Sequence, residues 1–219
     1  MAVLRRRRPV AEDGVTGPAG LRERKKARTR RALSDAAIAL FLEKGFDAVS
    51  VAEVAAAAEV SKPTLFRYFP AKEDLVLHRF ADHEDESARV VEAGRARGAA
   101  PLDALYEHLV DGLERRDPVT GLCDVPAVLA YHRLLYGTPA LLAGIHGYQQ
   151  RSEEALARAL GGDPLPARLA AGQIVAVLRV LANENVVRLT AGETVDAVAG
   201  DAVAAAEAAF RSLREGLPY

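Results

Sequence analysis

Twelve residues from Ser61 to Lys72, SKPTLFRYFPAK, combine cations, hydroxyls and aromatic rings at close spacing. Lys and Arg side chains can donate hydrogen bonds to guanine O6 and N7, and Thr or Pro can contact a thymine methyl group. A tyrosine hydroxyl, or a lysine beside unpaired backbone N–H groups, suits a phosphate oxygen. These types predict base-edge contacts from Lys62, Pro63, Thr64 and Arg67, and phosphate contacts from Tyr68 and Lys72.

The first of two short helices that position these side chains is predicted to start after Ser50. Ser50 and Glu53 form the S-x-x-E pattern of a capping box. A longer helix precedes it and ends before Gly45, which is suited to cap a helix C-terminus. The pattern predicts a short helix packed against a long one.

The second short helix follows a tight turn. Ser61 is a good N-cap, and Pro63 lies in the first turn, where its missing N–H costs little. Leu65 and Phe69 are four apart and share the face that packs inward, so the first turn and Arg67 face outward. Two short helices, a tight turn and a backing helix are the anatomy of a helix-turn-helix.

A basic block precedes these helices. From Arg22 to Arg31, seven Lys or Arg residues stand against one Glu. Cations at a helix N-terminus are unfavourable by roughly 0.3–1 kcal/mol each at low salt, and nearby phosphates would reverse that cost. A charge run alone is usually a solvated face, but this one adjoins two capped helices. The predicted DNA-binding set therefore also includes Lys26, Thr29 and Ser61.

Charge is divided unevenly along the chain. Residues 1–80 carry 16 Lys+Arg against 10 Asp+Glu, a net +6, whereas the remainder carries 13 against 20, a net −7. A polyanionic partner is therefore expected at the first third only. Half of the 219 residues are apolar, and none of the chain alternates apolar and polar residues for long, so we predict an all-α protein with a substantial core.

The compartment and cofactor expectations follow from composition. The single cysteine, Cys123, excludes an intramolecular disulfide and a multi-cysteine zinc site. The basic start meets Pro, acids and Gly where a signal peptide would be apolar, and the uncharged run 134–150 contains Pro139 and three glycines. We expect a cytoplasmic protein with no membrane partner, no metal and no cofactor.

Three segments are predicted. Residues 1–20 form a flexible basic arm, residues 21–70 a helix-turn-helix DNA-binding domain, and residues 71–219 a larger helical regulatory and dimerisation domain. The arginines at 5–8 either track a minor groove or form a solvated tail. In the third segment, one helix is expected from near Lys72 to about 97, followed by helices at 102–114, 126–136, 139–160, 167–189 and 195–216.

Tyrosine and histidine gather in the middle of the chain. Both offer an apolar body and a polar tip, which suits a pocket that orients a small organic molecule. The alternative is that the rings are half-buried core residues with satisfied hydroxyls. The predicted ligand-binding set is Tyr106, Tyr131, His132, Tyr136 and Tyr148.

The last two helices favour a homodimer. The segment from Leu169 to Leu178 is apolar nearly all round, so one face is expected to meet its own domain and another a partner. The small residues at 201–210 let helices approach closely, and two helices from each subunit would make a four-helix interface. The predicted interface residues are Leu178, Leu181, Ala205, Ala209 and Phe210.

The stretch 45–76, GFDAVSVAEVAAAAEVSKPTLFRYFPAKEDLV, resembles the DNA-binding domain of TetR-family transcriptional regulators. The resemblance implies an Ω-like dimer with a three-helix N-terminal head and a larger C-terminal ligand-binding and dimerising body. It also implies phosphate contacts from Ser50, Tyr68 and Lys72, and base contacts from the turn beginning at Lys62.

Three residues depart from the family pattern. Glu59 replaces a glycine of the turn, so a left-handed backbone there would cost about 1 kcal/mol. Ala71 replaces a serine cap, and Phe66 replaces a tyrosine. The segment LLYGTPAL and the C-terminal helix are similar to an actinobacterial subgroup whose bodies are described as binding acyl-CoA-like ligands.

The sequence thus predicts a ligand-responsive transcriptional regulator, a repressor released from a pseudo-palindromic operator by a small organic ligand. A dimeric DNA-binding protein without a ligand is the first alternative. A helical enzyme is the second, but no nucleophile or acid–base constellation is evident, so no catalytic residue is predicted.

Overall fold

The structure is a computed structural model that describes residues 18–81 and 83–216. Within those ranges it contains helices and no strand, which confirms the all-α prediction. The elements in chain order are α1 (Pro18–Lys44), α2 (Val51–Ala57), α3 (Lys62–Tyr68), α4 (Asp74–Ala81), α5 (Glu86–Ala96), α6 (Pro101–Glu114), the 3-10 helix η1 (Pro118–Thr120), α7 (Pro126–Gly137), α8 (Pro139–Leu160), α9 (Pro164–Thr190) and α10 (Val195–Glu215).

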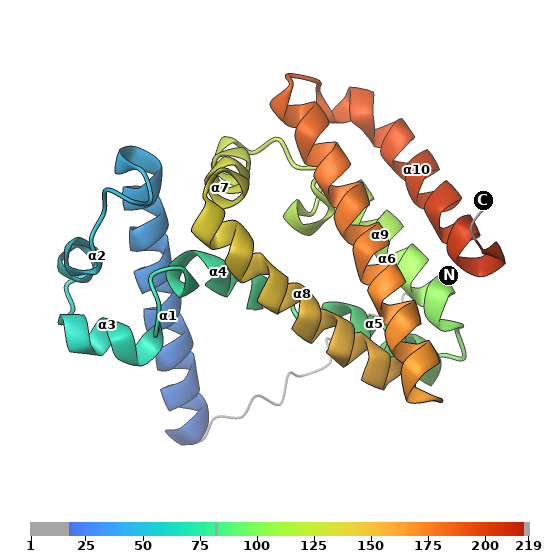
Figure 1. Cartoon of the computed structure of the whole chain (residues 1–219), viewed down its shortest axis with the longest axis horizontal. Coiled ribbons are helices and arrows are strands. Elements are labelled where there is room, and N and C mark those ends of the chain that lie inside the picture. Colours follow the sequence, from blue (N-terminus) through green and yellow to red (C-terminus); the bar gives the residue numbers. More distant parts are fainter. Residues whose placement is uncertain (1–17, 82, 217–219) are drawn as a thin grey trace, which may run out of the picture.

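The helices form two groups that lie side by side (Figure 1). Helices α1 to α3 make the head, and α5 to α10 make the body, in which α9 packs against α8 and α10, α5 against α8, and α6 against α5 and α10. Helix α1 begins at Pro18, three residues before the predicted start. The predicted arm otherwise lies outside the described residues, including the arginines at 5–8.

The predicted single helix from near Lys72 to about 97 is wrong. Helix α4 begins only at Asp74 and ends at Ala81, and α5 begins at Glu86 after a turn. The intervening stretch is strongly polar, ADHEDE, and lacks the apolar periodicity that would bury one face of a continuous helix. The segment that joins head to body therefore consists of two short helices, α4 and α5, separated by a turn.

Head and body share one hydrophobic core. Leu33, Phe41 and Leu65 of the head and Leu135 and Leu141 of the body are each no more than 1% exposed and belong to one cluster. Helix α4 lies between the two groups and supplies further buried residues to this cluster. Because side chains in a close-packed core shift together, a displacement of α7 or α8 will also move side chains of the head.

Three contacts hold α4 in place. The buried Ser34 hydroxyl of α1 donates to the Leu75 carbonyl at 2.7 Å. From the other side, the Tyr131 hydroxyl of α7 donates to the Val76 carbonyl at 3.0 Å. A Cβ added at Gly144 of α8 would lie 2.3 Å from Cδ1 of Leu77, so the glycine allows α8 to approach α4 closely.

The body has two further clusters, and η1 is fixed against α9 beside them. The buried Asn185 amide donates to the Thr120 carbonyl at 2.9 Å. Gly121 follows with φ +73, and a Cβ there would lie 2.0 Å from the Ala182 carbonyl oxygen. Glycine is required at this position both for the left-handed backbone and for the close approach.

A three-residue polar cluster joins the turn after α4 to α5 and α6. Glu86 Oε2 lies 2.7 Å from His83 Nδ1, and Glu86 Oε1 lies 2.9 Å from His108 Nε2. Hydrogen bonds from His108 and then His83 hold the pKa of Glu86 far below its ordinary value, although burial opposes this. The hydrogen bond to Glu86 raises the pKa of His108 above 6.5 against the effects of burial and Arg115, and Asp111 raises it slightly further.

This cluster makes stability depend on pH in a defined direction. Because the folded-state pKa of His108 is raised, its contribution is fully present below about pH 6.5 and is lost as the pH rises through the folded pKa. The contribution of Glu86, whose pKa is lowered, is present above pH 4.5 and is lost in acid. The cluster therefore stabilises the fold most between these two values.

We expect the urea-derived free energy of unfolding to fall between pH 6.5 and 8.5. The His108 side chain is 41% exposed, so screening by solvent limits the fall to less than about 1 kcal/mol. His108→Gln should flatten this slope, whereas His146→Gln, at an exposed position of α8, should leave it unchanged. A wild-type slope that persists in His108→Gln would contradict the assignment.

Candidate nucleic-acid interface

Helix α3 presents its first turn to solvent and its underside to the core. Leu65 is 0% and Phe69 1% exposed, so they fix the helix to the head. Lys62, Pro63 and Arg67 are exposed. The outward placement predicted for the first turn is confirmed, and Lys62 to Thr64 are free to approach a duplex.

Several contacts hold α3 in this orientation. The Ser61 hydroxyl caps the helix by accepting from the Thr64 N–H at 3.3 Å, and the two hydroxyl oxygens of Ser61 and Thr64 lie 2.8 Å apart. Arg30 of α1 donates to the Tyr68 carbonyl at 3.3 Å and lies 5.3 Å from the centroid of the Phe69 ring. The basic block thus contributes a residue that clamps the end of α3, a role that sequence reasoning missed.

The exposed cations of α3 rest on their own aromatic neighbours. Lys62 Nζ lies 5.9 Å from the centroid of the Phe66 ring, and Arg67 lies 5.7 Å from that of Tyr68. Such contacts restrict long side chains without neutralising their charge. Phe66 is 41% exposed, so the phenylalanine that replaces the family's usual tyrosine contacts Lys62 rather than the core.

The start of α2 confirms the predicted capping box. The Ser50 hydroxyl accepts from the Glu53 N–H at 3.2 Å, and the Ser50 N–H donates to the Glu53 carboxylate at 2.8 Å. The backbone hydrogen bond from Ser50 is the main cause that lowers the pKa of Glu53. The Ser50 hydroxyl accepts in this bond, so its own O–H remains able to donate to a phosphate oxygen.

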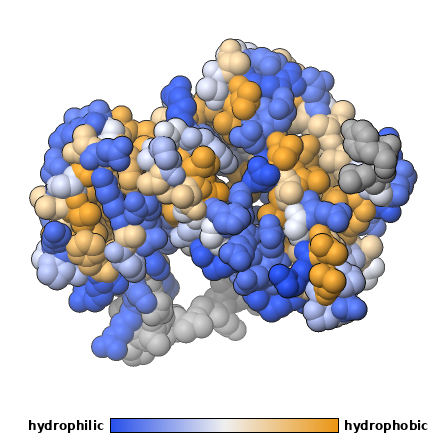
Figure 2. Space-filling model, in the orientation of Figure 1, coloured by the Kyte–Doolittle hydropathy of each residue, from blue (hydrophilic) through white to orange (hydrophobic). Residues whose placement is uncertain are grey.

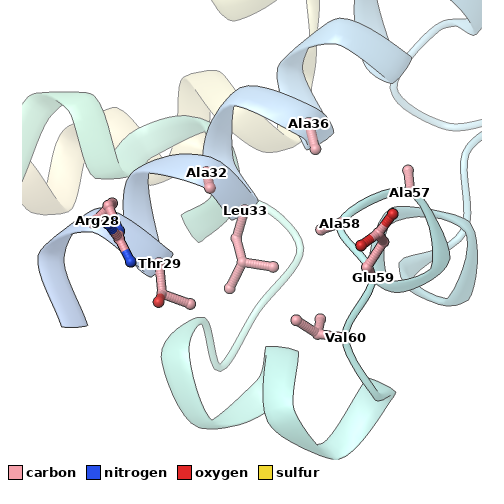
Figure 3. Close-up of a pocket in the computed structure, with 9 residues that line it drawn as sticks. All are labelled: Arg28, Thr29, Ala32, Leu33, Ala36, Ala57, Ala58, Glu59 and Val60. Atoms are coloured by element: carbon pink, nitrogen blue, oxygen red, sulfur yellow. The ribbon is translucent and has the colours of Figure 1, made fainter. Parts of the chain in front are cut away.

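The turn between α2 and α3 has the left-handed backbone that was considered for Glu59. Its φ is +54, so a glutamate holds a left-handed conformation that glycine adopts more easily. A shallow groove of about 400 Å³ lies between this turn and α1, and Leu33 and Val60 point into it (Figure 3). Thr29 lies at its α1 side and donates its hydroxyl to the Lys25 carbonyl at 3.0 Å, whereas Lys26 is exposed.

Lys72 lies two residues before the first residue of α4 and not at the helix start, and its phosphate contact stays a prediction. It lies in the turn before α4, and its Nζ donates to the Phe46 carbonyl at 2.5 Å and lies 4.4 Å from the centroid of the Phe46 ring. The Ala71 N–H donates to the Asp74 carboxylate at 2.9 Å, which is the half of a capping box that does not need a serine hydroxyl. Lys72 therefore ties this turn to the loop after α1, and its ammonium keeps two further N–H groups that can donate to a phosphate.

The predicted ligand-binding rings fall into two places. Tyr131, His132, Tyr136 and Tyr148 belong to α7 and α8 next to α4, where Phe80 lies 6.3 Å from Tyr131 and 6.5 Å from Tyr148 between ring centroids. The His132 and Tyr136 rings are stacked 6.0 Å apart. Tyr106 is separate, on α6, where it packs 5.5 Å from Phe210.

Burial governs the chemistry of these rings. It raises the pKa of Tyr131, Tyr136 and Tyr148, and it lowers the pKa of His132. His132 Nδ1 is buried without a hydrogen-bond partner among the described residues. None of the five rings lines the groove beside α1, nor a second groove of about 460 Å³ in the body, so the use of these rings as a ligand site stays a prediction.

The apolar face that lacks a partner in the protomer lies on α9 and α10. Helix α9 is long and apolar enough to span a membrane by length and composition alone, yet only 17% of its most apolar window is buried. Its exposed stripe consists of Leu165, Leu169, Ala176, Val180 and Val187, and small exposed residues, Ala197, Gly200, Ala204 and Ala208, line α10. Hydrophobic residues are visible over the position of α9 in Figure 2.

One predicted interface residue, Phe210, is unavailable to a partner, and the other four stay predictions. Phe210 is 0% exposed inside the protomer, and Leu178 and Leu181 are half-buried against the body core. Ala205 is exposed and Ala209 is half-buried. The sequence showed that α9 is apolar all round, but only packing against α8 and α10 determines which side remains outside. The exposed stripe of α9 and α10 is the apolar surface that remains open to a partner.

The fold and the exposed α3 define a helix-turn-helix protein with a helical second domain. The model of the family "Bacterial regulatory proteins, tetR family" matches residues 33–78, and the chain belongs to this family. Among the described residues, no group of three His, Cys, Asp or Glu side chains is arranged to hold a metal ion.

Known proteins similar to the chain agree with this assignment. The HTH-type transcriptional regulator TcmR of Streptomyces glaucescens is 36% identical over 148 residues, which cover 67% of this chain and 63% of TcmR. The chain therefore matches somewhat less than two thirds of the length of this curated relative.

Two solved structures share the fold. NalD of Pseudomonas aeruginosa, the secondary repressor of the MexAB-OprM multidrug efflux pump, has a TM-score of 0.57 at 21% identity and covers 84% of this chain and 96% of its own. FadR of Thermus thermophilus, solved with lauroyl-CoA, has a TM-score of 0.51 at 20% identity and covers 87% and 95%. At these identities the likeness shows the fold alone.

Proposed function

We propose that the protein is a homodimeric, ligand-responsive transcriptional repressor that acts in the cytoplasm. The observation that carries the proposal is the placement of α3, whose first turn of Lys62, Pro63 and Thr64 faces outward while Leu65 and Phe69 lock its underside. In this arrangement the N-terminal end of a recognition helix can enter the major groove. Base-edge contacts come from Lys62 to Thr64 and Arg67.

The backbone of the duplex is held by the surrounding residues. Tyr68 and the N-cap hydroxyls of Ser50 and Ser61 offer hydrogen bonds to phosphate oxygens, and Lys26 and Thr29 of α1 lie along the same basic segment. Lys72 joins them, because its ammonium has two N–H groups left after it donates to the Phe46 carbonyl. Because phosphate contacts release counterions, binding will weaken steeply with salt.

The unpartnered face of α9 and α10 supports a dimer. A second copy presents the same apolar stripe and the same small residues, so a two-fold interface between them is self-complementary. The two heads, related by the two-fold axis of this dimer, would contact half-sites about 34–36 Å apart, which is one helical turn of DNA. The operator is therefore expected to be a pseudo-palindrome.

The shared core of head and body supports control by a ligand. Tyr131 of α7 is hydrogen-bonded to α4, and α4 is hydrogen-bonded to α1, so a movement of α7 or α8 reaches the head through packed contacts. A coupling of about 1–3 kcal/mol between a body site and the DNA site is sufficient to release an operator. Four of the candidate rings, Tyr131, His132, Tyr136 and Tyr148, lie beside this path, and Tyr106 lies apart from it.

Footprinting of the purified protein on the DNA that flanks its own gene tests this function. The expected result is protection of a two-fold symmetric site with two half-sites one helical turn apart, lost as salt is raised. Protection without two-fold symmetry would overturn the dimeric arrangement. Absence of any sequence-selective protection at low salt would overturn the regulator proposal.

A further inference from the structure

An apolar groove of about 460 Å³ opens in the body where the ends of four helices meet. The first turn of α6, the last residue of α8, the early part of α9 and the end of α10 form its walls, at the end of the body that is remote from the head (Figure 1). Its volume is in the range of small-molecule sites. Most of its lining is aliphatic, from Pro101, Leu102, Leu160, Ile174 and Leu213.

Three polar side chains line this groove, Asp103, Gln173 and Arg214, and the arginine keeps N–H groups to spare. Arg214 Nη2 donates to Asp103 at 2.7 Å, and its Nε and Nη1 groups make no hydrogen bond within the described part of the chain. The Arg214 side chain is 40% exposed, so these N–H groups are accessible. Gln173 is exposed beside them and adds an amide.

The N-terminus of α6 adds a further donor at the same place. Its N-cap is Ala100, which provides no side-chain hydrogen bond, and Pro101 has no N–H. The next backbone N–H, that of Leu102, has no acceptor in the preceding turn. The positive end of the helix dipole therefore points towards a groove that already holds a guanidinium.

We propose that this groove binds a small amphipathic acid, with an aliphatic chain or ring along the apolar walls and one carboxylate at Arg214. A carboxylate is the acceptor that a guanidinium with free N–H groups binds in a planar, two-bond geometry. Asp103 competes for the same guanidinium and so weakens the site. The inference rests on the proposed function, since it names the class of ligand to which the body responds.

The groove is distinct from the ring set predicted from the sequence. None of Tyr131, His132, Tyr136 and Tyr148 borders it, and Tyr106 is linked to it only through Arg214, whose guanidinium lies 5.9 Å from the centroid of the Tyr106 ring. Gln173 lies on α9 between Leu169 and Ala176 of the exposed stripe, so the groove opens at the edge of the proposed dimer face.

Calorimetric titration of the full chain with decanoate, below its micelle concentration, tests the proposal. The expected result is one decanoate per protomer, and binding at least about tenfold weaker for decyltrimethylammonium, which has the same chain and the opposite charge. Arg214→Gln should lower the affinity for decanoate about tenfold. Asp103→Asn should raise that affinity several-fold, because it releases Arg214. Arg211→Gln is the matched control, because this arginine of α10 pairs with Glu207 and does not line the groove.

Blocking the groove gives the second arm of the experiment. Ala170→Trp should fill the space and abolish decanoate binding, and Ala170→Met provides a milder filling if the larger ring prevents folding. Equal binding of both amphiphiles, or decanoate binding unchanged by Arg214→Gln and Ala170→Trp, would overturn the proposal. Operator binding by the same variants is measured in parallel. Groove variants that bind DNA but not decanoate support the proposed ligand site. A wild-type protein that binds decanoate but no operator overturns the proposed function without contradicting the ligand site.

Discussion

Replacing Lys62 with alanine is expected to weaken operator binding by roughly 30-fold to 10⁴-fold. A good base contact is worth about 1–3 kcal/mol, and a dimer loses two of them at once, which gives about 2–6 kcal/mol. Lys62 is exposed and contacts only the ring of Phe66 within the described residues, so the head should remain folded. Fluorescence anisotropy with an operator fragment and a scrambled fragment of equal length measures the effect.

The comparison with a control variant decides how this loss is interpreted. Arg158→Ala removes an exposed cation from α8, far along the chain from the head, and should change operator affinity little. If Lys62→Ala lowers affinity for the operator and for the scrambled fragment equally, Lys62 binds phosphate and not a base edge. If neither variant changes affinity, the recognition role assigned to the first turn of α3 is wrong.

Val180→Glu is expected to convert the dimer into monomers at micromolar concentration. Val180 is 55% exposed at the centre of the apolar stripe of α9, and a two-fold interface would bury it together with its copy. An unpaired charge buried in this way costs about 3–5 kcal/mol, so the dimer dissociation constant should rise at least 100-fold. Sedimentation velocity measures the change, and operator affinity should fall with it because one head cannot hold two half-sites.

Leu142→Glu is the matched control substitution for Val180→Glu. Leu142 is 47% exposed on α8 and lies outside the stripe of α9 and α10, so the same change in charge and size should leave the dimer intact. A wild-type protein that sediments as a monomer, or a Val180→Glu variant that sediments as the wild type does, would show that the apolar stripe is not a dimer interface.

The sequence alone determined the head of this protein. Capping residues, prolines and the spacing of Leu65 and Phe69 act within one or two helical turns, so the start of α2 and the position and orientation of α3 follow from neighbouring residues. The same local rules located most body helices to within a few residues. They failed at the junction between α4 and α5, where no strong breaker marks the end of the helix.

Only the tertiary structure decided which faces of the body helices are free. Helix α9 is apolar on every side, and its packing against α8, α10 and η1 places Leu178 inward and Val180 outward. The groove beside Arg214 is likewise formed by four helix ends that are far apart in the sequence. Local patterns specify helices and their caps because hydrogen bonds and dihedral preferences act over a few residues, whereas faces and cavities depend on contacts between distant segments, which no short window of sequence contains.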